Sequence, residues 1–536
     1  MTSHPTRSPR KRLWLLISGI LVLGALTWVG SNYVTSFAHH DADAQQAVST
    51  EASEAQVQEF CGYCHKVPTP DLFARDAWPR EVGQGFDFHR ISGRTDIVPP
   101  SYESVVMYYQ NRAPEELRLR PSEPFFPPPS VLFEPRCYRV PEQQSQPAIS
   151  NVNLVHLFRK DKLDVLVCDM REGWITAFQP YENPPKSRIL GKAANPAHAE
   201  VVEFEGNGVK DIIVADLGNF APTDWKVGKV ILLKGSRDGK FTPFTLLENV
   251  GRVADVQAAD FNGDGKLDLI VAVFGWRTTG EIIYLENQTT DWSHPKFIPH
   301  IVDDRHGAIH VPPADLNNDG KMDFVALISQ EHETIVAFLN DGHGNFRKET
   351  IYTGPHPAYG STGIQLVDLN NDGKLDVLYT NGDVMDSGTL RPDHGVQWLE
   401  NKGTFPFKHH HLLSMYGVQR ACAADIRHTG LKDIVAVNCL PEEIYGRRLL
   451  WGLNLDSIAL LEQTAPGQFT RHTIEKSNCN HVTCALGSLN GDDKIDLVTG
   501  DFYFRPSAKE ITDSITVWKN QGDRHATAGG TNATSK

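Results

Sequence analysis

The chain has 536 residues, a formal net charge of −14 and 40% hydrophobic residues. Charged residues make up 22% and aromatic residues 9%, which excludes wholesale disorder because enough apolar surface is present to bury a core. The acidic balance argues against a nucleic-acid partner, since such proteins carry a basic patch. The 43 glycines and 33 prolines indicate many turns.

The first candidate element is the apolar run Leu13–Val29, which basic residues precede. Its 17 residues are at the short end of a bilayer-spanning helix. The flanking charges predict a cytoplasmic N-terminus with the rest of the chain outside. We therefore expect residues 1–35 to form a cytoplasmic tail and signal anchor that holds the protein at the membrane, on the periplasmic or extracytoplasmic side. The alternative is a signal peptide cleaved near Ser36–Ala38, which would release a secreted form.

A short cysteine motif follows the predicted anchor. Cys61, Cys64 and His65 form C-x-x-C-H, the pattern of c-type haem attachment. The two thiols add across the two vinyl groups of one porphyrin, and the adjacent histidine reaches the iron as proximal ligand. A zinc site would need a second pair of ligands nearby, and a redox dithiol would need a βαβ context. The motif therefore predicts one covalently bound haem c.

We expect residues 55–120 to form a small all-α domain around this haem. The segment Ser101–Leu117 is predicted to be an amphipathic helix that resembles the closing helix of small cytochromes c. The sixth iron ligand stays open between His89 and Met107, and a five-coordinate iron is a third possibility; a methionine ligand would give the higher potential. Residues 121–130 are proline-rich and predict a stiff linker.

Beyond the linker the sequence repeats a nine-residue pattern with start-to-start spacings of 47 to 63 residues. Periods of this size indicate propeller blades or solenoid turns. The clearest copies are 260–268, 315–323 and 368–376; weaker copies are 156–164, 203–211, 425–433 and 488–496. An apolar segment enters each copy and further short β-branched segments leave it, which predicts a four-stranded blade.

The ends of this region indicate how the ring closes. The last repeat has its third strand at Ser514–Asn520 and no fourth strand follows, while Val131–Val140 matches an outer strand. We therefore predict a mainly β fold: a seven-bladed propeller over residues 131–520, closed by its N-terminal strand and followed by a disordered tail at 521–536. A closed ring leaves no exposed edge strand. The cytochrome c-like domain and the membrane helix precede it.

The spacing D-x-N-x-D-G-x-x-D within the clear copies is typical of an oxygen-rich cation loop. Side chains at positions 1, 3 and 5, the carbonyl at position 7 and the carboxylate at position 9 converge on one point, which suits Ca²⁺. The flanking segments are strands and position 12 is not glutamate, so the loops are not EF-hands. The alternative is that they are only Asx-type turns.

These repeats resemble the FG-GAP/VCBS repeats of integrin α-subunit propellers and of many exported bacterial proteins. The resemblance implies three full Ca²⁺ sites and a fourth, weaker one in the loop at 488–496, where Ser488 and Asp493 depart from the pattern. Carried over by position, the ligands are Asp260, Asn262, Asp264, Lys266 (carbonyl) and Asp268; Asp315, Asn317, Asp319, Lys321 (carbonyl) and Asp323; Asp368, Asn370, Asp372, Lys374 (carbonyl) and Asp376; and Asn490, Asp492 and Asp496.

A possible active site lies where the blades converge. His198, Asp255, His310 and Arg420 each lie five residues before position 1 of their loop, so we expect them to meet at the propeller axis. They are candidates for metal binding or acid–base catalysis, and the alternative is that they are polar residues meeting water at a channel mouth. No nucleophile elbow, Walker loop or H-E-x-x-H motif is present.

Six cysteines remain outside the haem motif, and an oxidising compartment permits disulfides. Cys422 could pair with Cys439, and Cys479 with Cys484.

Three functions stay open. The first is an exported electron-transfer haem protein whose propeller binds a redox partner protein or a substrate. The second is a Ca²⁺-dependent adhesion or glycan-binding module with an accessory haem, and the third is an oxidoreductase that uses the axial cluster.

Overall fold

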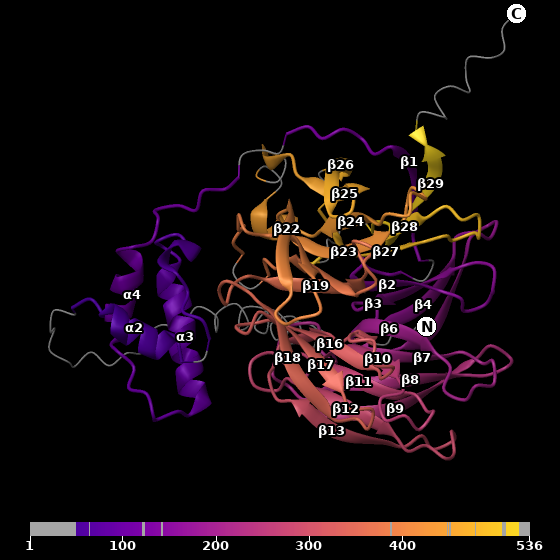
Figure 1. Ribbon diagram of the computed structural model, residues 1–536, viewed down its shortest axis with the longest axis horizontal. Helices are drawn as coiled ribbons and strands as arrows, with labels where there is room; N and C mark the ends of the chain where they lie inside the picture. Colours follow the sequence, from indigo (N-terminus) through magenta and orange to yellow (C-terminus); the bar gives the residue numbers. More distant parts are fainter. Residues whose placement is uncertain are drawn as a thin grey trace, which may run out of the picture.

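The computed structural model describes residues 50–63, 65–120, 124–140, 143–385, 388–446, 449, 452–476, 479–505 and 511–524. Figure 1 shows a small helical unit beside a large ring of strands. The predicted anchor, Cys64 and the end of the predicted tail lie outside the described residues. Within those residues, no helix combines the length and the apolar character that a bilayer crossing requires.

The helical unit consists of α2 (Glu54–Cys61), the 3₁₀ turn η2 (Pro70–Leu72), α3 (Trp78–Ser92) and α4 (Tyr102–Gln110). Helix α2 begins with a capping box between Ser53 and Gln56, which satisfies two backbone donors at its start. Its C-cap is Gly62, the second residue of the C-x-x-C-H motif. A Cβ there would lie 2.3 Å from the Gln58 carbonyl oxygen, so only glycine fits this turn.

Helix α4 begins at Tyr102, one residue later than predicted, and is shorter than predicted. Ser101 caps its first turn, and the helix ends at Gln110 rather than near Leu117. The reason is Pro114, since a proline disfavours helical geometry in the residue before it and cannot donate a hydrogen bond. The apolar face of α4 packs against α2 and α3, and the Trp78 and Tyr109 rings stack with centroids 3.8 Å apart.

The strands of the described residues form seven sheets, which confirms the seven-bladed propeller. Blade one is β2 (Ile149–Val155), β3 (Asp164–Asp169), β4 (Trp174–Gln179) and β5 (Lys186–Lys192). Blade two is β6 (Pro196–Val202), β7 (Asp211–Asp216), β8 (Gly228–Gly235) and β9 (Phe241–Val250). Blade three is β10 (Val253–Ala259), β11 (Asp268–Val273), β12 (Glu281–Asn287) and β13 (Phe297–Asp303).

Blade four is β14 (Ala308–His310) with β15 (Pro313–Ala314), then β16 (Asp323–Ile328), β17 (Thr334–Asn340) and β18 (Phe346–Thr353). Blade five is β19 (Ser361–Val367), β20 (Asp376–Asn381), β21 (Gly395–Glu400) and β22 (Lys408–Ser414). Blade six is β23 (Val418–Ala424), β24 (Asp433–Asn438), β25 (Asp456–Ala465) and β26 (Gln468–Lys476), with the short helix α5 (Glu442–Tyr445) between β24 and β25.

Blade seven closes the ring as the sequence predicts. Its strands are β27 (His481–Gly487), β28 (Asp496–Asp501), β29 (Ile515–Asp523) and β1 (Val131–Tyr138), in the order β1-β29-β28-β27. Strand β1 pairs antiparallel with β29 over almost its whole length. The outermost strand of the last blade therefore comes from the beginning of the ring, which ties the two ends of the propeller together.

The hydrophobic core lies between neighbouring blades. The second strand of each blade is buried at every residue, as in the sequence DLIVAV of β11, because both of its faces are covered. The outer strands mix exposed and covered residues, as β18 does. Inner and middle strands of adjacent blades share one apolar cluster, for example β7 and β8 with β10 and β11.

The alternating strand directions give the propeller two faces. The nine-residue loops join each inner strand to the second strand on one face, which we call the loop face. The links between blades and the hairpins between the second and third strands lie on the other, which we call the hairpin face. The helical unit contacts the hairpin face: Arg391 donates to the Leu72 carbonyl at 2.9 Å, and Arg277 lies 4.2 Å above the Phe88 ring.

Candidate functional site

A register shift recurs at one position of the inner strand in all seven blades. It follows the first residue of each inner strand and leaves an extra residue there. A β-bulge re-aims the neighbouring side chain and is common beside functional sites. The residue that resumes the pairing is Asn151, His198, Asp255, His310, Gly363, Arg420 or Thr483, in blade order.

The four predicted axial residues meet. His198 Nδ1 lies 2.8 Å from Asp255 Oδ1, and His310 Nδ1 lies 3.7 Å from Asp255 Oδ2. On the far side, Arg420 Nη1 is 3.2 Å from His310 Nε2. Four blades thus contribute to one chain of polar contacts, in which Asp255 is the central carboxylate.

Two effects determine the pKa values in this axial cluster: burial, which disfavours charge, and the charges of the neighbouring side chains. Burial alone would lower the pKa of His198, but the Asp255 carboxylate raises it above the ordinary value. Burial would likewise raise the pKa of Asp255, yet His198 and His310 hold it well below its usual range. Burial lowers the pKa of His310, and the Arg420 charge adds to that effect. These contacts therefore favour the charged form of His198 beside an ionised Asp255 and the neutral form of His310, whose Nε2 lies 3.2 Å from Arg420 Nη1.

Glycine in blade five allows Arg420 to cross to His310. A Cβ at Gly363 would lie 3.3 Å from Arg420 Cδ, so a larger residue there would press on the arginine. A cavity of about 630 Å³ lies on the loop-face side of the cluster, between the inner strands. Its lining combines polar residues, among them Glu200, Gln257 and Arg420, with apolar residues such as Leu267 and Ile364. Arg420 belongs to both the cluster and the cavity.

The three full nine-residue loops have one geometry. In each, backbone N–H groups of the loop donate to the carboxylate at position 1, as Gly320 does to Asp315 at 2.9 Å. Repulsion among the carboxylates contributes to a raised pKa: for Asp323, burial is the main cause and the Asp319 and Asp315 charges add to it. The position-7 lysines reach only the position-5 carboxylate, at 4.0, 3.9 and 3.7 Å. These oxygen-rich, like-charged loops fit a divalent cation.

The aspartate at position 9 has a structural role that the sequence reasoning missed. It opens the second strand of every blade and is at most 1% exposed. Its oxygens accept backbone hydrogen bonds from the loop and from the end of the third strand; Asp268, for example, accepts from Phe261 N at 3.3 Å and Asn287 N at 2.7 Å. The available signal was that this aspartate persists at 164, 211 and 433, in loops that depart from the pattern at several other positions.

In the loops of blades six and seven, positively charged side chains of the protein bind the carboxylate at position 9. In blade six, Arg427 at position 3 donates to both oxygens of Asp433, at 2.8 to 3.2 Å. In blade seven, Lys519 Nζ reaches from β29 and lies 2.7 Å from Asn490 Oδ1, 2.8 Å from Asp496 Oδ2 and 3.8 Å from Asp492 Oδ2. The residues predicted to form a fourth, weaker calcium site thus already surround an ammonium group.

Two histidines of the helical unit have nitrogens suited to an iron. His65 Nδ1 donates to the Lys66 carbonyl at 2.9 Å, which places the lone pair on Nε2. His89 packs against the Phe60 ring with centroids 5.4 Å apart, and its buried Nε2 has no hydrogen-bond partner among the described residues. Met107 lies half-buried on α4, and Cys61 ends α2 beside Tyr109. These residues fit a c-type haem.

A polar network that sequence reasoning missed lies under the helical unit. His356 Nε2 is 2.7 Å from Asp393 Oδ2 and 3.2 Å from Arg391 Nη2. The guanidinium of Arg391 also lies 5.5 Å from the Phe73 ring, and Ala358 packs against the helical core. These residues come from connections of different length, so no spacing in the sequence aligns them.

The structure places Cys422 beside a cysteine other than Cys439, the partner that the sequence suggested. Cys422 Sγ lies 3.6 Å from Cys484 Sγ, across the contact between blades six and seven. Both cysteines lie on inner strands: Cys422 is two residues beyond the bulge position of blade six, and Cys484 is one residue beyond that of blade seven. They meet because inner strands of neighbouring blades face each other around the axis.

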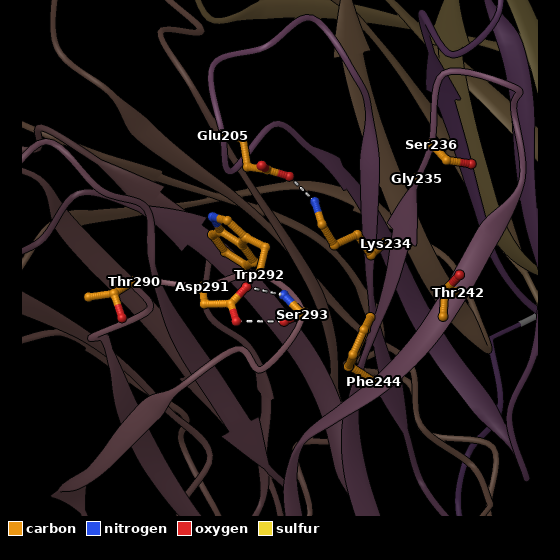
Figure 2. Close-up of a pocket in the computed structure, with 10 residues that line it drawn as sticks. All are labelled: Glu205, Lys234, Gly235, Ser236, Thr242, Phe244, Thr290, Asp291, Trp292 and Ser293. Carbon is orange, nitrogen blue, oxygen red and sulfur yellow. Dashed lines mark hydrogen bonds and ion pairs between the residues drawn. The ribbon is translucent and has the colours of Figure 1, made fainter.

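A second cavity, of about 530 Å³, lies on the loop face between blades two and three (Figure 2). Of its two aromatic rings, Phe244 and Trp292, the second has Lys234 Nζ 5.2 Å from its centroid. Lys234 is in turn paired with Glu205. Asp291 accepts hydrogen bonds from Ser293 at the rim. A sugar ring stacking on this face of Trp292 would have to displace the lysine.

A buried histidine ties blade six to blade seven and predicts a pH-dependent stability. His481 is fully buried between Asp501 Oδ1 and Glu475 Oε2, each 2.9 Å from a ring nitrogen. Burial would lower its pKa, but the two carboxylates raise it to about 9. A raised histidine pKa stabilises the fold fully below about pH 6.5, and this contribution is lost as the pH rises to about 9.

Chemical unfolding across this range should therefore show about 3 kcal/mol of stability lost for the wild type. The His481→Gln variant, which cannot titrate, should lack that slope although it is less stable throughout. Equal slopes for the two proteins would refute the assignment.

Comparison with known proteins supports the class of fold. The profile of the FG-GAP-like repeat matches residues 203–271 and 315–379. The chain is therefore a seven-bladed β-propeller that contains FG-GAP-like repeats, and such a propeller is suited to a binding platform. No curated protein matches the sequence.

Two solved structures give low-scoring similarities. The crystal structure of BBS1N in complex with ARL6DN, soaked with lead, is 10% identical and covers 75% of this chain and 98% of its own, with a TM-score of 0.42. The same complex soaked with mercury is 9% identical and covers 73% and 99%, with a TM-score of 0.41. Scores of this size bear on neither the fold nor the function of this chain.

Proposed function

We propose that the protein is a membrane-anchored, exported c-type haem protein for electron transfer, whose calcium-stabilised propeller is the platform for a redox partner or a substrate. The motif Cys61, Cys64 and His65 carries this proposal. The anchor at residues 1–35 and the extracytoplasmic location follow from the charges around Leu13–Val29, and they agree with covalent haem attachment, which suits an exported chain.

The chain's own residues have separable roles in this function. Cys61 and Cys64 would hold the haem, which supplies one-electron chemistry when bound. His65 would offer its Nε2 to the iron, because its Nδ1 donates to the Lys66 carbonyl. The unpartnered Nε2 of His89 favours His89 over Met107 as the second ligand. Three calcium ions in the loops of blades three, four and five would stiffen the blades whose opposite face contacts the helical unit.

The test is the visible spectrum and intact mass of the full chain produced in a haem-attaching host. We expect one haem joined covalently, with a spectrum that changes on reduction. The double variant Cys61→Ser/Cys64→Ser should lose the adduct, whereas the exposed Cys137→Ser should retain it. His89→Ala should keep the adduct and shift the absorption bands. A wild-type mass without haem would refute the proposal.

The axial cluster favours a second candidate function, an oxidoreductase whose substrate enters the axial cavity. Its support is the convergence of His198, Asp255 and His310 beside a cavity of about 630 Å³ that both polar and apolar residues line. Substrate-dependent reduction of the haem that disappears in His310→Ala would favour this enzyme. Binding of a partner or glycan without any redox change would favour the binding module instead.

A further inference from the structure

A cluster of two histidines and a glutamate on the hairpin face belongs to none of the sites above. His306 lies in the link from β13 to β14, and Glu331 and His332 lie in the hairpin from β16 to β17. One ligand atom from each of the three residues lies within 4.8 Å of the other two. The cluster therefore joins the entrance of blade four to its second hairpin, away from the loop face and its calcium-type loops.

The donor atoms of this cluster are available. His306 Nε2 lies 2.9 Å from Glu331 Oε1, and the His306 and His332 rings have centroids 5.0 Å apart. His332 Nε2 is buried and has no hydrogen-bond partner among the described residues. A buried polar atom without a partner is costly, and in a native protein it calls for an explanation such as a bound ion.

Neighbouring residues pack against the cluster, and the adjacent arginine does not pair with its glutamate. A Cβ at Gly280 would lie 2.3 Å from His306 Cα, so only glycine lets the β11–β12 hairpin approach the link that carries His306. The cation on the same link, Arg305, donates from its guanidinium to Asp303 at 2.8 and 2.9 Å, so its charge is already paired. The carboxylate of Glu331 thus faces two imidazoles rather than a fixed positive side chain.

We propose that His306, Glu331 and His332 form a binding site for a divalent transition metal ion of the zinc type. Two imidazoles and one carboxylate are the ligand set of many such sites, which keep a further position for water or substrate. Ligand atoms about 2.1 Å from a tetrahedral ion lie about 3.4 Å apart. This value lies between the 2.9 Å from His306 Nε2 to Glu331 Oε1 and the 4.8 Å that bounds all three separations, so side-chain shifts on the order of 1 Å would seat the ion.

The proposed metal site packs against the part of the propeller that contacts the helical unit. Gly280, which packs against His306, lies in the same hairpin as Arg277, the residue over the Phe88 ring of α3. The site thus packs, through His306, against the β11–β12 hairpin, whose Arg277 contacts Phe88 of α3, the residue before His89. Metal binding there would order the hairpins on which the helical unit rests.

The experiment uses the full chain with its haem, saturated with calcium so that the loop-face sites do not take up the probe. Zinc alone is titrated by calorimetry, and the bound metal is counted by elemental analysis after dialysis. We expect one zinc ion in the wild type. His332→Ala and the shape-preserving Glu331→Gln should weaken its binding by at least about 100-fold.

The matched control is His343→Ala, an exposed histidine on the opposite face of the same blade. It should bind zinc like the wild type, and all variants should give the same circular dichroism. No zinc in the wild type, or equal zinc affinity in Glu331→Gln and His343→Ala, would overturn the proposal.

Discussion

Removing calcium from the purified protein should lower its free energy of unfolding by about 8 kcal/mol. A ligand that binds only the folded state at about 100 times its Kd stabilises it by about 2.7 kcal/mol, and we propose three such sites. The physical reason is that each full loop gathers three carboxylates that repel one another without a cation. Thermal unfolding with calcium and with excess chelator measures the effect. An unchanged transition would show that the loops are Asx-type turns that need no ion.

Two aspartates at the same loop position separate calcium binding from general destabilisation. Asp319 in blade four and Asp492 in blade seven both occupy position 5, with Lys321 Nζ at 3.9 Å and Lys519 Nζ at 3.8 Å. Only the blade-seven lysine also contacts the residues at positions 3 and 9, Asn490 and Asp496. Asp319→Asn should reduce the calcium content from three ions to two. Asp492→Asn should leave three ions bound, because the Lys519 ammonium already supplies the positive charge. A loss of one calcium ion in Asp492→Asn would instead place a fourth site in blade seven.

Replacing Asp255 by alanine should cost about 3–5 kcal/mol of stability, which is the expected price of leaving a buried charge without its partner. Asp255 is 2% exposed, lies 2.8 Å from His198 and also accepts from Val311 N at 3.0 Å. Denaturant unfolding near neutral pH measures the loss. The exposed Asp238→Asn is the control and should change stability by less than about 0.5 kcal/mol.

The double variant Asp255→Asn/His198→Gln tests whether the charge pair is the cause. If the penalty comes from an uncompensated imidazolium, the double variant should be more stable than the sum of the two single effects predicts. Strict additivity would mean that Asp255 acts through its hydrogen bond to Val311 rather than through His198.

Much of the propeller could be predicted because each blade repeats a local pattern. The loop pattern recurs at a nearly constant distance from the inner strand, so the positions of His198, Asp255 and His310 could be aligned by counting five residues back from each loop. Ring symmetry then brings equivalent positions to one axis, and the structure places them within contact. The closing strand followed from a count of strands, since a blade with three strands at one end needs a fourth from the other.

The cations of blades six and seven show why other contacts could not be predicted. Arg427 replaces a ligand within its own loop, but Lys519 arrives from a different strand whose distance in sequence says nothing about its reach. The same holds for Cys422 and Cys484, which only the packing of two inner strands brings together.

By itself, the sequence determined the number of blades, the closure of the ring, the loops suited to calcium and the residues of the haem motif, because these depend on local spacing. The tertiary structure alone decided three further features. It showed which charges compensate one another around Asp255, that the helical unit lies on the hairpin face, and that His306 meets Glu331 and His332. These depend on contacts between hairpins and links of irregular length, and no periodicity of the sequence records where such segments meet.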